Sequence, residues 1–174
     1  MKYLLVLLLL PFSTFSQERH HPLVPKYGAI FDTPFAVSIV DTSITYKVVI
    51  DVTEAPQDPI TEVNQIYDRV AKLMNLHAEA GVKEANMNFV CVIHYKATTS
   101  VLSDEGFMKE FGKNNPNTEV IQLLADHGVK FYVCGQSLIA RKIIDLPLNP
   151  NIKPIHGAIL GLSHFQNLGY ALMN

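Results

Sequence analysis

The chain has 174 residues, of which 14 are Lys or Arg and 16 are Asp or Glu, so its formal net charge near pH 7 is −2. This length favours one domain with a core of its own. No cluster of Lys or Arg stands out, which argues against nucleic acid as the main partner. A domain of this size does not need a disulfide, so its two cysteines, Cys91 and Cys134, must be judged by where they stand.

Residues 1–16, MKYLLVLLLLPFSTFS, are typical of a secretory signal peptide: Lys2 precedes an apolar run that begins at Tyr3, and small polar residues follow. The run is shorter than the roughly 20 apolar residues of a membrane span. A buried N-terminal helix is the alternative, but no capping residue opens it. We therefore expect an exported, periplasmic protein that starts near Gln17 and has no membrane span. Without Lys2 it carries 13 basic and 16 acidic residues, a net charge of −3.

The segment 17–44 contains Pro22, Pro25 and Pro34, which interrupt any long regular element. We expect it to form an irregular N-terminal arm or edge segment. The β-branched run TYKVVIDV at 45–52 then predicts the first strand, and a turn-forming cluster, TEAPQDP, follows it.

The next two elements are a helix and a strand. A helix is predicted from Pro59, with Asp58 as its cap, apolar residues at spacings of three and four as far as His77, and Gly81 as its stop. The run MNFVCVIHY at 87–95 is almost continuously apolar, which predicts a strand covered on both faces.

The second half continues the alternation. Short helices are expected at Ser103–Phe111 and at 116–127, the second stopped by Gly128, and the run VKFYVC at 129–134 predicts a third strand. A further helix is expected near Ser137.

Near the C-terminus, HGAILGL and YALM are two further strand candidates around SHFQNLG. Alternating strands and helices of these lengths predict an α/β fold in which helices cover both faces of a parallel sheet. Ligands bind beyond the carboxyl ends of the strands in such folds.

Cys134 is the first candidate site residue, because it stands at one of these strand ends. The thiolate is the reactive form of cysteine, and the N-terminus of a helix stabilises it. Gly135 would allow a sharp turn, and Ser137 could cap the following helix. The alternative, equally compatible with the pattern, is that Cys134 is one more small apolar residue of a buried strand.

Cys91 lies in the middle of an apolar run, which favours an inert core residue. A disulfide between Cys91 and Cys134 would require Cα atoms within about 7 Å of each other. One cysteine is in mid-strand and the other at a strand end, so neighbouring parallel strands would hold them out of register. We expect no disulfide.

His94 and Lys96 are the other candidates around this edge. His94 ends the second strand as Cys134 ends the third, so its imidazole could hold or relay a proton for the thiol. A histidine hydrogen-bonded within a loop is the alternative. Lys96 could stabilise a thiolate electrostatically, although a solvated lysine is the simpler interpretation.

The sequence lacks the residue patterns that several other chemistries require. The remaining histidines form no zinc-type spacing, so no metal is expected. The segment after the first strand contains no glycine, which argues against a nucleotide cofactor, and no cofactor is predicted. No GxSxG nucleophile elbow is present, since Ser137 stands in CGQSLI.

The stretch GVKFYVCGQSL resembles the DsrE/DsrF-like family of sulfur-relay and related proteins. Further similar segments are YGAIFD, YKVVIDVTE, VAKLMNLHAEAGV, FVCVIH, NPNTEVIQLLADHGVKFYVCGQSL and FQNLGYALM, which together cover nearly all of the chain after residue 16. The resemblance implies a three-layer α/β/α sandwich with a central, mostly parallel five-stranded sheet, here over residues 45–174. It also implies a homo-oligomer, a trimer or hexamer, and neighbouring second and third strands that bring His94 toward Cys134.

In the family's sulfur-transfer members, a cysteine matching Cys134 carries sulfur as a persulfide. This implies a sulfurtransferase or sulfur carrier with Cys134 and His94 as reacting groups, and with Gly135, Gln136, Ser137 and Lys96 around them. Its partners would be a sulfur donor or acceptor protein or a small sulfur compound. One departure is Tyr95, which stands where the family often has glycine.

Two further interpretations stay open. The scaffold could serve as a non-catalytic homo-oligomeric binding or interaction module in which Cys134 only packs. A thiol oxidoreductase would instead require a reversible bond between Cys91 and Cys134.

Overall fold

The structure is a computed structural model that describes residues 18–174. The expected signal peptide, 1–16, therefore lies outside the described residues. No helix in residues 18–174 is long and apolar enough to cross a membrane.

Five parallel strands form the central sheet, in the order β6-β5-β4-β3-β7. Their bounds are β3 Tyr46–Val52, β4 Met87–Ile93, β5 Lys130–Cys134, β6 Ile152–Ile155 and β7 Ala171–Met173. The strands expected at 45–52, 87–95 and 129–134 are confirmed as β3, β4 and β5, which lie side by side in the middle. The fold is the expected three-layer α/β/α sandwich.

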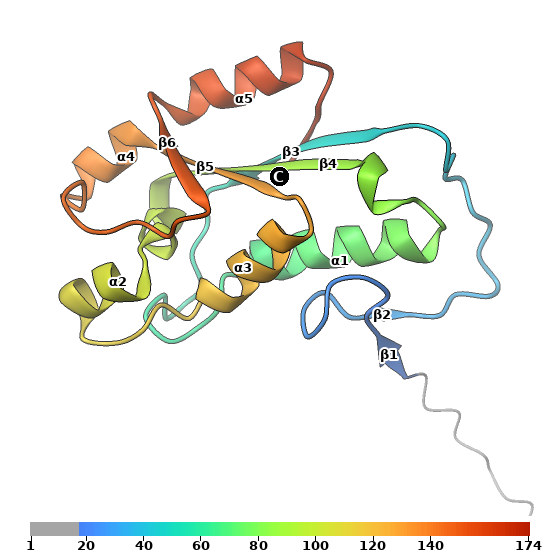
Figure 1. Ribbon diagram of the computed structural model, residues 1–174, viewed down its shortest axis with the longest axis horizontal. Coiled ribbons are helices and arrows are strands. Elements are labelled where there is room, and N and C mark those ends of the chain that lie inside the picture. The colour runs from blue at the N-terminus through green and yellow to red at the C-terminus, as the bar shows by residue number, and fades with distance from the viewer. Residues whose placement is uncertain (1–17) are drawn as a thin grey trace, which may run out of the picture.

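Helices cover the two faces of the sheet unequally (Figure 1). The α-helices are α1 Gln65–Glu79, α2 Asp104–Phe111, α3 Thr118–Asp126, α4 Gly135–Ala140 and α5 Ala158–Asn167, with 3-10 turns η1 Glu84–Asn86 and η2 Tyr95–Val101. The helices α1 and α3 lie on one face, and α5 lies on the other. Because α1 and α3 bury a large apolar cluster and α5 only a small one, the stability of the fold rests mainly on the α1 face.

The arm carries a small antiparallel pair, β1 Arg19–His20 and β2 Ile30–Phe31, and is otherwise irregular, as expected. The amide of Asn75, a fully buried residue of α1, holds the segment between the two strands. Its oxygen accepts from the N–H groups of Leu23 and Val24 at 2.9 and 2.7 Å. Its nitrogen donates to the carbonyls of Val24, Tyr27 and Gly28. The arm is thus bonded directly to the core.

The helix expected from Pro59 was placed too early, because α1 begins at Gln65. Asp58 does bind a nearby backbone N–H, that of Ile60, but it organises a separate turn. The true cap is Asn64, whose side chain accepts from the N–H of Ile66 at 2.9 Å. The expected stop is confirmed: Gly81 has φ +86°, a conformation that glycine adopts without steric cost.

The prediction that HGAILGL forms a strand was wrong, because these residues lead into α5. Its apolar residues face two ways: Leu162 and Phe165 pack on the sheet, whereas Ile159 and Leu160 are exposed. The strand that does pair with β5 is β6, which the pattern missed because it contains Pro154. Proline is tolerated there since β6 is an edge strand. The YALM prediction is confirmed by β7.

Candidate functional site

Cys134 is the last residue of β5, and α4 begins at the very next residue, Gly135. Cys134 therefore occupies the N-cap position itself. The expectation that Ser137 caps this helix was wrong, since Ser137 lies inside its first turn. From there the Ser137 side chain hydrogen-bonds to the sulfur instead. The short distance along the chain between thiol and hydroxyl is what brings these two groups together.

Burial and hydrogen bonding shift the pKa of the Cys134 thiol in opposite directions. Burial raises the pKa of the thiol, because the residue is only 6 % exposed and a charge is poorly solvated there. The Ser137 hydroxyl and the backbone N–H groups of Ser137, Ala158 and Gln136 oppose this effect by hydrogen bonding to the sulfur. Their combined effect is larger, so the pKa of Cys134 lies below the ordinary value for a thiol.

Gly135 has a different role from the one its sequence context suggests. The turn into α4 does not use a positive φ at this residue. What glycine provides is space, since a Cβ at position 135 would lie 3.0 Å from the carbonyl oxygen of Ile155 in β6. This close approach lets β6 pair with β5 as far as Cys134.

His94 follows β4 directly, and its backbone N–H donates to the carbonyl of Val52 at 2.9 Å. The β4–β5 register ends with Ile93 opposite Val133, so His94 and Cys134 are next in line on neighbouring strands. The imidazole makes a 2.7 Å hydrogen bond through Nε2 to the carboxylate of Asp51 on β3. Asp51 thus fixes the orientation of His94 at the strand end.

The loop after His94 is joined to α4 through Tyr95. The N–H of Tyr95 donates to the Ser137 hydroxyl at 3.3 Å, so this hydroxyl accepts from the loop and can donate to the thiol. Tyr95 has φ +57°, a left-handed conformation that glycine adopts more easily. The loop therefore keeps a glycine-like backbone although its residue is tyrosine.

The side chains of Lys96 and Gln136 interact with Glu54 and with the carbonyl of His156. The ammonium of Lys96 lies 3.2 Å from the Glu54 carboxylate, on the loop after β3, which is an exposed ion pair. The side-chain nitrogen of Gln136 donates to the carbonyl oxygen of His156 at 3.4 Å, whereas the backbone N–H of Gln136 helps to lower the pKa of the Cys134 thiol.

The two cysteines lie on opposite faces of the sheet. Cys91 belongs to the cluster under α1 and α3, and Cys134 to the cluster under α5. The register also puts Cys91 opposite Phe131, well before Cys134 on β5. Both thiols are free, as expected. Burial raises the pKa of the Cys91 thiol far above its usual range, which fits the expectation of an inert core residue.

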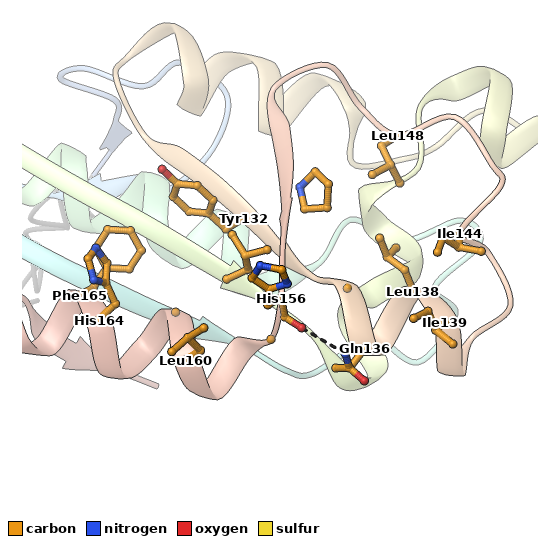
Figure 2. Close-up of a pocket in the computed structure, with 15 residues that line it drawn as sticks. Tyr132, Gln136, Leu138, Ile139, Ile144, Leu148, His156, Leu160, His164 and Phe165 are labelled. Carbon is orange, nitrogen blue, oxygen red and sulfur yellow. Dashed lines mark hydrogen bonds between the residues drawn. The ribbon is translucent and has the colours of Figure 1, made fainter.

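A groove of about 870 Å³ lies beside the thiol, between α4, β6 and α5. Figure 2 shows Leu138 and Ile139 on one side of it and His164 and Phe165 on the other. Cys134 does not line the groove, but its neighbours Gly135, Gln136 and Gly157 do. The lining is mainly apolar and contains no Lys or Arg.

Sequence reasoning missed two contributors to this site. Asp51 is the lone acid near the end of an apolar strand, and that isolation was the available signal. The backbone N–H of Ala158 was hidden because its segment resembles a strand; Gly157 before an apolar spacing of three and four would have indicated a helix start.

A parallel five-stranded α/β/α sandwich with a thiol at a strand end defines the class of this protein. Its sequence from residue 47 to residue 174 matches the DsrE/DsrF-like family, and the chain belongs to that family.

Two solved structures share the fold. One is the structure of the protein of unknown function MTH1491 from Methanobacterium thermoautotrophicum, with 17% identity, a TM-score of 0.54 and coverage of 74% of this chain and 97% of that one. The other is the crystal structure of the ychN protein from E. coli, with 19% identity, a TM-score of 0.52 and the same coverages. No curated protein matches the chain.

Proposed function

We propose that this protein is an exported sulfur carrier that holds sulfur as a persulfide on Cys134. The observation that carries the proposal is the position of Cys134 at the N-cap of α4, where hydrogen bonds from the Ser137 hydroxyl and from three backbone N–H groups lower the pKa of the thiol despite its burial. A structural cysteine needs no such bonds, as Cys91 illustrates. Membership of a family with sulfur-relay members supports the same chemistry.

The proposed reaction is a sulfur exchange. The Cys134 thiolate attacks the outer sulfur of a persulfide donor, R–S–SH; the donor's S–S bond breaks, and R–S⁻ leaves with the electron pair of that bond. Cys134 then carries –S–SH, and the exchange needs no external oxidant or reductant. The imidazole of His94, oriented by Asp51, is the candidate to protonate the leaving thiolate. An acceptor thiolate repeats the attack on the outer sulfur of Cys134.

The groove beside Cys134 is the candidate approach for donor and acceptor, because Gly135, Gln136 and Gly157 belong both to its lining and to the surroundings of the thiol. Lys96 is proposed only to flank this site, since its own partner is Glu54. Export to the periplasm rests on residues 1–16. N-terminal sequencing of the secreted protein tests it, with a start near Gln17 expected.

The experiment is intact-mass measurement after incubation with a low-molecular-weight persulfide, polysulfide or thiosulfate. We expect a gain of one or more sulfur atoms, located at Cys134 by peptide mapping and reversed by dithiothreitol. Cys91→Ala is the matched control and should gain sulfur normally, whereas Cys134→Ser should gain none. Absence of any gain on the wild type, while a control thiol peptide is modified, would disprove the proposal.

A non-catalytic homo-oligomeric module is the second candidate. It is favoured by exposed apolar side chains on α4 and α5, namely Ile139, Ile159 and Leu160. If this candidate alone is correct, the protein is a trimer or hexamer by light scattering, and Cys134→Ser changes neither its assembly nor any ligand binding.

A further inference from the structure

Three side chains that are far apart in the sequence meet near the start of the described chain: His20 of β1, Asp32 just after β2 and Glu79 at the end of α1. Their Nε2 and carboxylate oxygens all lie within 4.8 Å of one another. The β1–β2 pairing explains why His20 and Asp32 lie close together. His20 is opposite Ile30, so Asp32, two residues further on, is its diagonal neighbour on the same face of the pair.

The separations of His20 Nε2 from the two carboxylates are close to those between metal ligands. His20 Nε2 is 3.1 Å from Glu79 Oε2 and 3.6 Å from Asp32 Oδ1. Nitrogen and oxygen ligands at about 2.0–2.2 Å from a tetrahedral Zn²⁺ are separated from one another by roughly 3.3–3.6 Å. Adjustment of these side chains would bring all three atoms within reach of one cation.

The local charge also favours a cation. Glu79 is the last residue of α1, a helix of 15 residues, so its carboxylate lies at the negative end of the helix dipole. Asp32 adds a second carboxylate to the cluster. A divalent ion bound there would interact favourably with both carboxylates and with the negative end of α1.

We propose that His20, Asp32 and Glu79 form a binding site for a divalent transition-metal ion of the Zn²⁺ type. The imidazole nitrogen favours such an ion over Mg²⁺ or Ca²⁺, which prefer oxygen ligands. One or more water molecules complete the coordination. The ion joins the arm to the far end of α1, so the site regulates how firmly the arm is held and is independent of Cys134. Sequence spacing gave no sign of this site because its ligands come from three separate segments.

The test is Zn²⁺ titration by calorimetry in the Cys134→Ser protein, which lacks the thiol at the strand end that could also take up zinc. Mg²⁺ is titrated for comparison. We expect one Zn²⁺ per chain, a higher melting temperature with Zn²⁺ than with EDTA, and much weaker binding of Mg²⁺. His20→Asn and Glu79→Gln should each weaken Zn²⁺ binding by about tenfold or more. His21→Asn, which changes the adjacent exposed histidine, should leave binding intact.

Trypsin supplies a local readout, since Arg19 precedes His20 directly. Zn²⁺ should slow cleavage after Arg19 in the Cys134→Ser protein, the parent of these variants, and in His21→Asn. It should have no effect in His20→Asn. The proposal is overturned if the parent takes up no Zn²⁺. It is equally overturned if His20→Asn and Glu79→Gln, folded by circular dichroism, bind Zn²⁺ as the parent does, because the ion would then be held elsewhere.

Discussion

The two faces of the sheet shift the pKa of a cysteine in opposite directions. Under α1 and α3, Cys91 lies among large apolar side chains, and burial alone sets its pKa, which is raised. Under α5, Cys134 lies at the strand end, where backbone and hydroxyl donors lower its pKa despite burial. The comparison shows that hydrogen-bond donors can outweigh the effect of burial on the pKa of a thiol.

The largest expected difference between the faces is in thiol reactivity. In the native protein at pH 7.5 or so, iodoacetamide should modify Cys134 and leave Cys91 unmodified, because alkylation requires an accessible thiolate. We expect the rate at Cys134 to exceed that at Cys91 by more than about a hundredfold, and the difference to vanish in denaturant. Peptide mapping over time measures both rates. Equal rates in the native protein would contradict the assignment of the two faces.

The faces should also differ in how much a large aromatic side chain stabilises the fold. Phe131 is fully buried in the α1 cluster, so Phe131→Ala should cost about 3–5 kcal/mol. Phe165 of α5 is only half-buried, so Phe165→Ala should cost less, about 1–2 kcal/mol. Urea denaturation gives both values. Equal costs would mean that another subunit covers the α5 face in solution.

The two cysteines should change the stability of the fold in opposite directions as the pH rises. The pKa of Cys134 is lowered in the folded protein. Its contribution to the free energy of unfolding is therefore present above the pKa of the unfolded chain, about 8.5, and is lost as the pH falls through the pKa of the folded protein. The pKa of Cys91 is raised, so its contribution is present below about 8.5 and is lost as the pH rises above it, by about 1.4 kcal/mol per unit.

Urea midpoints between about pH 7 and pH 9.5 measure these slopes below the range of ordinary tyrosines. Stability should rise with pH up to about 8.5 because of Cys134 and should fall above that pH because of Cys91. Cys134→Ser should remove the rise, and Cys91→Ala should remove the fall. A wild-type fall that persists in Cys91→Ala would assign it to another group.

The smallest expected effect concerns Ser137. Ser137→Ala removes the hydroxyl that donates to the Cys134 sulfur, so the pKa of the thiol should rise and its alkylation at neutral pH should slow. A hydrogen bond worth about 0.5–1.5 kcal/mol corresponds to a roughly two- to tenfold slower reaction. Ser163→Ala, on the exposed side of α5, is the control. An unchanged rate would mean that the backbone donors alone stabilise the thiolate.

Much of the architecture could be predicted from the sequence, because the strands β3, β4 and β5 are central and their residues are almost all apolar or β-branched. The edges were harder. Pro154 disguised an edge strand, and the exposed Ile159 and Leu160 made α5 resemble a strand. At the site, Cys134 and His94 could be placed by counting to the strand ends. The donors from Ala158 and the carboxylate of Asp51 could not, since they depend on which segments the fold brings beside them.

Asn75 has a consequence for how the chain unfolds. Its single amide joins four arm residues to the middle of α1, and Gly28 lies so close that a Cβ there would overlap the backbone of Lys72. Arm and sandwich therefore form one cooperative unit. In native-state hydrogen exchange, the amide protons of Leu23 and Val24 should exchange at rates close to those of the core strands, although they belong to a segment almost without regular structure.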